Sequence, residues 1–154
     1  MDLSMALIKA DILMAKQGIS LFEQDGVREV KNMTAYHLQQ AAEKLIKIQI
    51  YRSGVEYDNR KLYVHNLVSL MKYAQSLNIC VSIPQEIDEN ALLISDWEAG
   101  SRYDIRFSIR IDTLKKIYNV IMDWCIKKFI LEVLDEGLNP LTVPNCTLRL
   151  RTSS

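Results

Sequence analysis

Residues 35–47 read AYHLQQAAEKLIK, and this stretch decides the fold. Its apolar residues recur three and four positions apart, which is the spacing of one face of an α-helix. The pattern continues on both sides, so we expect a helix over about residues 27–52 that ends at Ser53-Gly54. The predicted buried stripe comprises Ala35, Leu38, Ala42, Leu45, Ile46 and Ile50. A helix with such a face needs other helices to cover it.

The rest of the chain predicts more helices and few turns. Five glycines and three prolines in 154 residues are below the usual share, and a β-sandwich or barrel needs more turn residues. We expect further helices over about residues 3–24, 63–77, 84–97 and 112–136. Residues 99–111 alternate apolar and polar side chains, which predicts an extended segment before the last long helix. The expected fold is all-α, an antiparallel bundle of about five helices in a domain of residues 1–138, followed by a C-terminal tail of residues 139–154.

The first predicted helix carries two apolar rows at helical spacing. One row includes Leu3, Leu7, Ala10 and Met14, and the other includes Ile8, Ile12, Ala15, Ile19 and Phe22. Together they make an apolar face wider than one neighbouring helix covers. Either this helix is buried on two sides, or part of it contacts a second copy of the chain.

The second predicted helix also has a polar side with candidate binding residues. These are His37, Gln40, Lys44 and Lys47. Basic and amide side chains along one side of a helix suit a phosphate group or a nucleotide. The alternatives are a solvated face, or a polar contact between helices in which His37 and Gln40 hydrogen-bond a neighbour.

Arg60 and His65 form a second candidate pair. If they lie close together, His65 can act as a general base on a ribose hydroxyl while Arg60 stabilises the charged intermediate. Five residues apart on one helix, the two side chains would point in different directions, so the pair needs a turn between them. The alternative is a histidine that caps or packs at the start of a helix.

A third candidate is a basic cluster interleaved with aromatic residues. It contains Arg102, Arg106 and Arg110, with Tyr103 and Phe107 among them. Such a cluster suits a phosphate backbone and unstacked bases, and we expect Arg102 and Tyr103 to join the nucleotide site. The alternative is ion pairing with residues 86–98, which contain five acids and no base.

Charge and cysteine content exclude several functions. The formal net charge is zero, which argues against a strongly basic nucleic-acid binder and leaves room for a local basic face. Cys80, Cys125 and Cys146 are widely spaced and form no Cys-x-x-Cys pair, so we expect no metal site, no cofactor and no disulfide framework. That pattern favours the cytoplasm. No stretch approaches the roughly 20 apolar residues of a transmembrane helix, so we expect no membrane contact.

Several motifs resemble those of one known family. Residues 39–44, QQAAEK, resemble the signature helix of HEPN domains. His65-Asn66-Leu67 followed by Leu70 resembles the His-x-Leu-x-x-Leu motif of that family, and Arg102-Tyr103 resembles its Arg-Tyr pair before the last helix. The resemblance covers about residues 3–136. It implies an all-α domain of about five helices that commonly dimerises and is often encoded beside a minimal nucleotidyltransferase.

One branch of the HEPN family consists of metal-independent ribonucleases of toxin–antitoxin systems, which share an Arg followed four to six residues later by His near the last helix. Here no histidine follows Arg102, Arg106 or Arg110. The resemblance therefore favours a homodimeric module that is not an enzyme and that binds a nucleotide, RNA or a nucleotidyltransferase partner. The alternatives are a metal-independent endoribonuclease toxin that uses Arg60 and His65, and a purely structural dimerisation module.

Overall fold

The computed structural model describes residues 4–135, with side chains as far as Lys128. This part of the chain contains seven α-helices and no β-strand, so the all-α prediction is confirmed. The helices are α1 (Met5–Asp25), α2 (Arg28–Arg52), α3 (Asn59–Leu62), α4 (Leu67–Ser76), α5 (Gln85–Glu89), α6 (Ala91–Tyr103) and α7 (Ile111–Asp135). The tail expected at residues 139–154 lies outside the described residues, and the boundary after residue 138 stays a prediction.

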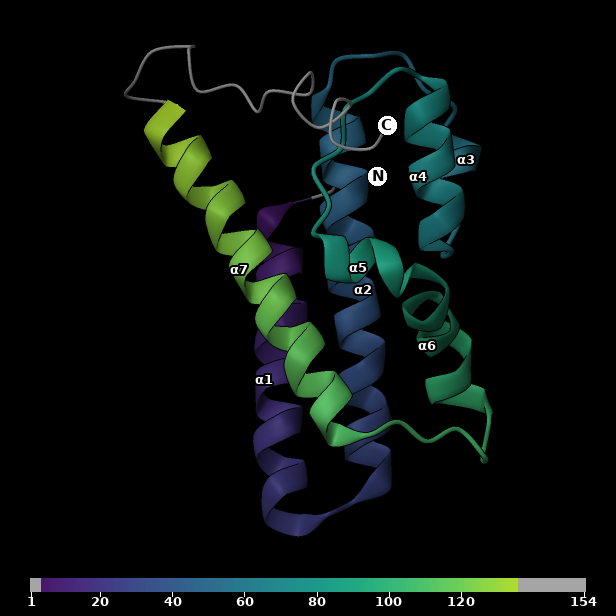
Figure 1. Ribbon diagram of the computed structural model, residues 1–154, viewed down its shortest axis with the longest axis vertical. Helices are drawn as coiled ribbons and strands as arrows, with labels where there is room; N and C mark the ends of the chain where they lie inside the picture. Colours follow the sequence, from purple (N-terminus) through teal and green to yellow (C-terminus); the bar gives the residue numbers. More distant parts are fainter. Residues whose placement is uncertain (1–3, 136–154) are drawn as a thin grey trace.

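Helix α2 is the central element of the bundle. Helices α1 and α2 form an antiparallel hairpin, α7 packs across both of them, and α4 and α6 lie on the other side of α2 (Figure 1). The hairpin turns at Gly26, whose φ of 66° is left-handed and whose N–H donates to the Phe22 carbonyl at 2.8 Å. Glycine adopts this conformation without a steric penalty.

The predicted stripe of α2 is the centre of the core. All six residues of that stripe are at most 1 % exposed. Trp97 of α6 and Leu114 of α7 are fully buried against the same core. Burial of so many apolar side chains is the main favourable term in folding, and here it fixes which sides of α2 remain available for other contacts.

The region after Pro84 differs from the single helix predicted there. Helix α5 ends at Glu89, and α6 begins after Asn90, whose side-chain amide donates to the Glu86 carbonyl at 2.7 Å. Asparagine competes in this way with the helical backbone, which accounts for the break. Helix α6 then continues past Trp97 as far as Tyr103.

The segment expected to be extended over residues 99–111 is shorter and begins with a turn: residues 104–110 connect α6 to α7, and the Phe107 N–H donates to the Asp104 carbonyl at 3.0 Å. Only some of the apolar side chains in the alternating pattern are buried: Ile109 is 9 % exposed, whereas Ile105 is 84 % exposed. Phe107 packs onto α6 at Gly100, where an added Cβ would lie 2.7 Å from the Phe107 ring. The small residue therefore lets the segment fold back against α6.

Two capped turns place His65 beside the upper part of α2. The Asp58 carboxylate accepts from the Arg60 backbone N–H at 2.9 Å and starts α3. The Asn66 side chain accepts from the Ser69 N–H at 3.1 Å and starts α4. Both are N-cap contacts of short polar side chains. They hold residue 65 just before α4.

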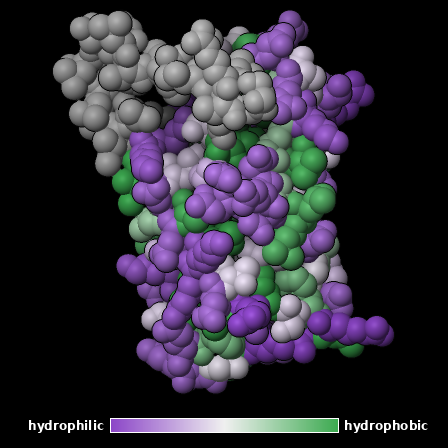
Figure 2. Space-filling view, in the orientation of Figure 1, coloured by the Kyte–Doolittle hydropathy of each residue, from purple (hydrophilic) through white to green (hydrophobic). Residues whose placement is uncertain are grey.

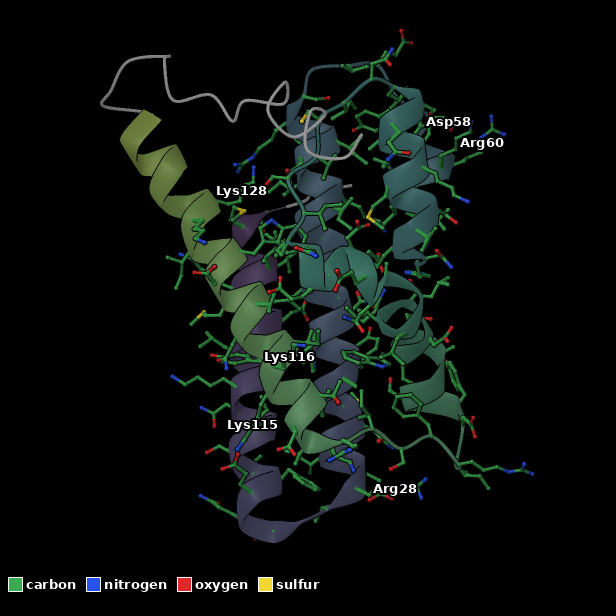
Figure 3. All side chains as sticks on the ribbon, in the orientation of Figure 1. Arg28, Asp58, Arg60, Lys115, Lys116 and Lys128 are labelled. Atoms are coloured by element: carbon green, nitrogen blue, oxygen red, sulfur yellow. The ribbon has the colours of Figure 1, made fainter. Side chains whose placement is uncertain are left out.

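Hydrophilic residues cover most of α7 on the face shown in Figure 2. Among them is Lys115, labelled in Figure 3, which donates to Glu23 of α1. This hydrogen bond to the Glu23 carboxylate raises the pKa of Lys115 above its ordinary value. The contact joins α1 to α7 at the surface of the bundle.

Candidate functional site

A buried ion pair on α2 anchors the polar side chains of the site. Glu43 and Lys47 are only 4 % and 5 % exposed at their side chains, and Lys47 Nζ donates to Glu43 Oε1 at 2.5 Å. Gln39 is fully buried, and its amide donates to Glu43 Oε2 at 2.8 Å and to the His65 carbonyl at 3.0 Å. Gln39, Glu43 and Lys47 follow one another at i, i+4 spacing, so they form a continuous polar ladder inside the bundle.

His65 contacts the same ladder from the start of α4. Its Nδ1 lies 3.1 Å from Glu43 Oε2, and 56 % of its side chain is exposed. When Nδ1 of a neutral imidazole donates to a carboxylate, Nε2 is the acceptor. A buried carboxylate thus orients an exposed imidazole.

A second polar cluster lies between α1 and α2. Asp11 is 8 % exposed in α1, and its two oxygens contact His37 Nδ1 at 2.9 Å and Lys44 Nζ at 2.5 Å. His37 and Lys44 are both half-buried. The predicted polar contact between helices therefore exists for His37, with Asp11 as the partner.

Gln40 connects the two clusters. Its amide donates to Gln39 Oε1 at 2.8 Å, and its own oxygen accepts from Lys44 Nζ at 3.3 Å. A chain of hydrogen bonds consequently runs from Asp11 through Lys44, Gln40 and Gln39 to the buried Glu43. Such networks stabilise strongly only when every member is satisfied.

Arg102 and Tyr103 lie at the end of α6, beside α2. The Arg102 guanidinium carbon lies 5.1 Å from the centroid of the Tyr36 ring and 4.8 Å from that of Tyr103. Arg102 also pairs with Glu98 one turn earlier, so part of the predicted pairing with the acidic stretch is present. Tyr103 is 73 % exposed. The centroid of the Tyr36 ring lies 5.4 Å from that of His37, so Tyr36 connects Arg102 to the cluster of Asp11, His37 and Lys44.

The other two arginines of the predicted basic cluster contact other groups. Arg110 lies 4.0 Å from Asp112 in an exposed pair, and the Arg106 backbone N–H donates to Asp104. The segment that carries them is tied to α2, since Asn32 donates to the Phe107 carbonyl at 3.3 Å and Arg28 donates to the Ile105 carbonyl.

Arg60 and His65 are not joined by any hydrogen bond or ion pair among residues 4–128. Arg60 is 93 % exposed at its side chain and pairs with Asp58 at 3.5 Å. Figure 3 shows it pointing away from the bundle at the α3 side. The two residues therefore have different partners: His65 contacts Glu43 of α2, and Arg60 contacts Asp58 at the start of α3.

A cavity of about 440 Å³ lies between residues 82–86 and α7, away from these clusters. Its polar lining includes Lys127 and Lys128 as well as Glu86 and Asp123, so opposite charges offset one another there. Trp124 also lines it, and its indole N–H has no hydrogen-bond partner among residues 4–128. Within the described part of the chain, no group of three or more metal-binding side chains comes together.

The cysteines follow the sequence analysis only in part. Cys125 is free and buried. Cys80 is disulfide-bonded, which the wide spacing of the cysteines did not predict. The cytoplasmic location inferred from that spacing stays a prediction. Across residues 4–135 no helix is long and apolar enough to cross a membrane.

The fold and the polar ladder of α2 define a class of protein. It is a small helical bundle in which most residues of the QQAAEK motif on α2 are buried. The sequence model described as "HEPN domain" matches residues 14–128, which is well over half of the chain. The chain belongs to the HEPN family. Searches of curated proteins and of solved structures gave no match. HEPN domains are generally nucleotide- or RNA-related modules or toxins, and they generally dimerise.

Sequence reasoning missed three side chains that organise the site, Asp11, Gln39 and Glu43. Each of them had a detectable signal. Asp11 interrupts an otherwise apolar row of the first helix, and a charged residue in such a row is buried only when it is paired. Gln39 and Glu43 precede Lys47 at four-residue spacing, which indicates a ladder rather than a solvated face.

Proposed function

We propose that this chain is a dimeric module that binds a nucleotide or single-stranded RNA, alone or with a minimal nucleotidyltransferase as partner. The proposed site combines His37, Gln40 and Lys44 of α2 with Arg102 and Tyr103 of α6. The observation that supports it best is that Arg102 lies over the rings of Tyr36 and Tyr103, and that the Tyr36 ring contacts the ring of the half-buried His37. Lys47, also predicted to bind phosphate, has the proposed role of supporting Glu43.

Base stacking carries this proposal. Tyr103 offers a largely exposed ring on which a base can stack, and Arg102 next to it can contact the adjoining phosphate. Stacking needs no net positive charge, and this matters because Lys44 and Arg102 each already have a carboxylate partner. A ligand phosphate would share Lys44 with Asp11 or displace that carboxylate.

Titration calorimetry with ATP and with a short single-stranded RNA tests the site. Loss of one stacked base costs about 1–3 kcal/mol, so Tyr103→Ala should weaken binding about 5- to 150-fold. Tyr63→Ala is the matched control, because Tyr63 is 64 % exposed and lies before α4. An absence of heat with both ligands would refute the proposal. If Tyr63→Ala weakened binding as much as Tyr103→Ala, the placement of the site at Tyr103 would be wrong.

The ribonuclease alternative remains a second candidate because of one contact, the pair between Glu43 and His65. The carboxylate contacts Nδ1, and more than half of the His65 side chain is exposed, so Nε2 of a neutral ring is the nitrogen that could accept a proton from a ribose hydroxyl. RNA incubated with the purified protein in the presence of a chelator should then be cleaved, and His65→Ala should abolish the cleavage. Lys127→Ala is the control, since Lys127 lies on α7 in an exposed pair with Asp123. Intact RNA with the wild type would exclude this candidate.

A further inference from the structure

The cavity between residues 82–86 and α7 has the dimensions of a small-molecule site. Its volume of about 440 Å³ falls in the range of ligand pockets, roughly 300–1,000 Å³. Helix α5 lies beside α7 here, and the connection that leads into α5 forms one wall (Figure 1). The residues that line this cavity include none of those proposed to bind a nucleotide, so a ligand held there would be separate from the nucleotide.

The inner part of the cavity is apolar and aromatic. Ile83 is 9 % exposed and Trp124 is 4 % exposed, and Pro84 and Val120 are half-buried. The indole N–H of Trp124 is buried and has no hydrogen-bond partner among residues 4–128. Buried donors without a partner are rare in folded proteins, and such a group commonly marks a place where a water, an ion or a ligand supplies the acceptor.

One wall of the cavity is held in place by α2. Gln49 Nε2 donates to the Ser82 carbonyl at 3.0 Å, and Gln49 Oε1 accepts from the Ser82 N–H at 2.8 Å. One side-chain amide thus satisfies both backbone groups of the residue at which this wall begins. A wall that is ordered before binding lowers the entropic cost of taking up a ligand, so the cavity is suited to a specific one.

Charged side chains of both signs line the outer part of the cavity. The acids are Glu86 and Asp123, and both are exposed. The bases are Lys127 and Lys128, and Figure 3 shows Lys128 on the side of α7 that faces the connection before α5. Asp123 and Lys127 pair at 2.9 Å, whereas Glu86 has no ion pair among residues 4–128. A ligand with a single charge would meet a like charge here, whereas a zwitterion finds an opposite charge for each of its ends.

We propose that this cavity binds a small zwitterion with an aromatic body, of which an aromatic amino acid is the simplest example. The ring of the ligand packs against Trp124 and Val120, its ammonium lies toward Glu86, and its carboxylate lies toward the two lysines. Stacking and charge complementarity then act on separate parts of one ligand. The site is a second function of the chain, beyond the proposed binding of a nucleotide or RNA.

NMR spectra of the isotopically labelled full chain, titrated with L-phenylalanine, test the site directly. The indole signal of Trp124 should shift and saturate, whereas that of Trp97, which is fully buried in α6, should stay in place. The spectrum of Trp124→Phe assigns the two signals. An unchanged Trp124 signal at millimolar ligand would overturn the proposal, and equal shifts of both signals would overturn the position of the site.

Two analogues that each lack one charge test the class of ligand. Phenethylamine has no carboxylate and hydrocinnamate has no ammonium, so each should bind about 2- to 5-fold more weakly than L-phenylalanine, the effect of one exposed ion pair. If either analogue bound as tightly as L-phenylalanine, the ligand would not be a zwitterion and the proposal would be wrong.

Glu86→Gln tests where the ammonium lies. Glu86 is exposed on α5, so the variant should stay folded, and it should weaken L-phenylalanine binding about 2- to 5-fold without weakening that of hydrocinnamate. Asp88→Asn is the matched control, because Asp88 is exposed on the same helix and does not line the cavity. An equal loss in both variants would overturn the placement of the ammonium at Glu86. Every measurement is made without nucleic acid, so its outcome is independent of the proposed nucleotide site.

Discussion

The buried pair between Glu43 and Lys47 should contribute measurably to stability, and Lys47→Met tests this. Methionine keeps most of the volume and removes the ammonium that lies 2.5 Å from Glu43. Breaking a buried ion pair from one side costs about 3–5 kcal/mol, because the remaining charge is left unpaired. Glu43 retains hydrogen bonds from Gln39 and His65 in this variant, so we expect the lower end, about 3 kcal/mol.

The reverse substitution, Glu43→Met, should cost more. It leaves the Lys47 ammonium buried with no other acceptor among residues 4–128, and it removes the acceptor of Gln39 and His65 as well. We expect about 5 kcal/mol. The double variant with both residues changed to methionine should recover part of this loss, since two apolar side chains can replace a buried pair at little cost.

Urea unfolding followed by circular dichroism measures these differences. With a slope of about 2 kcal/mol per molar urea, a loss of 3 kcal/mol lowers the midpoint by about 1.5 M. Lys127→Met is the control, because Lys127 and Asp123 form an exposed pair at 71 % and 63 % exposure, and such pairs contribute about 1 kcal/mol or less. If Lys47→Met cost no more than this control, the reasoning from the buried ladder would be wrong.

Three further outcomes follow from the structure. Gly100→Ala should lower the free energy of unfolding by about 1–3 kcal/mol in thermal or urea unfolding, since the new methyl group would lie 2.7 Å from Phe107; an unchanged midpoint would contradict that contact. Asp11→Asn should tighten ATP binding in calorimetry, because Lys44 loses its competing carboxylate, and weaker binding would count against Lys44 as a phosphate ligand. RNA affinity should fall with salt at a slope of about −0.7, as for a single phosphate contact, whereas a slope near −2 would indicate several.

The sequence predicted the core of α2 well because burial follows helical periodicity. The stripe from Ala35 to Ile50 is buried as expected, and the ends of α1, α2 and α7 agree with the prediction within two residues. The same rule failed at residues 99–111. There the helix α6 continues to Tyr103, and Ile105 is exposed although the alternation suggested burial. The alternating pattern shows which side chains are apolar, but it does not show which of them are buried. Phe107 packs against Gly100, whereas Ile105 has no such contact and stays exposed.

The candidate site was harder to predict because pairing partners are contributed by distant helices. His37 and Lys44 were found as polar residues of one helix, but their shared partner Asp11 comes from α1. Lys44 and Lys47 lie on the same predicted polar side of the helix. Only the fold shows that Lys47 is buried and Lys44 is half-buried. Periodicity therefore identified the helix and its polar residues, and it did not identify which polar groups contact one another.

The zero net charge of the chain is matched near the proposed site, where basic and acidic side chains form pairs. Each cation near the proposed site has an acid beside it: Lys44 has Asp11, Lys47 has Glu43 and Arg102 has Glu98. A surface of this kind attracts nucleic acid weakly over long distances, because few counterions are released when a phosphate binds. Affinity must then come from contacts that need no net charge, and the exposed Tyr103 ring supplies one of them. Of these three pairs, Lys44–Asp11 is bonded across helices, and it fixes the position of the lysine proposed to contact a ligand phosphate.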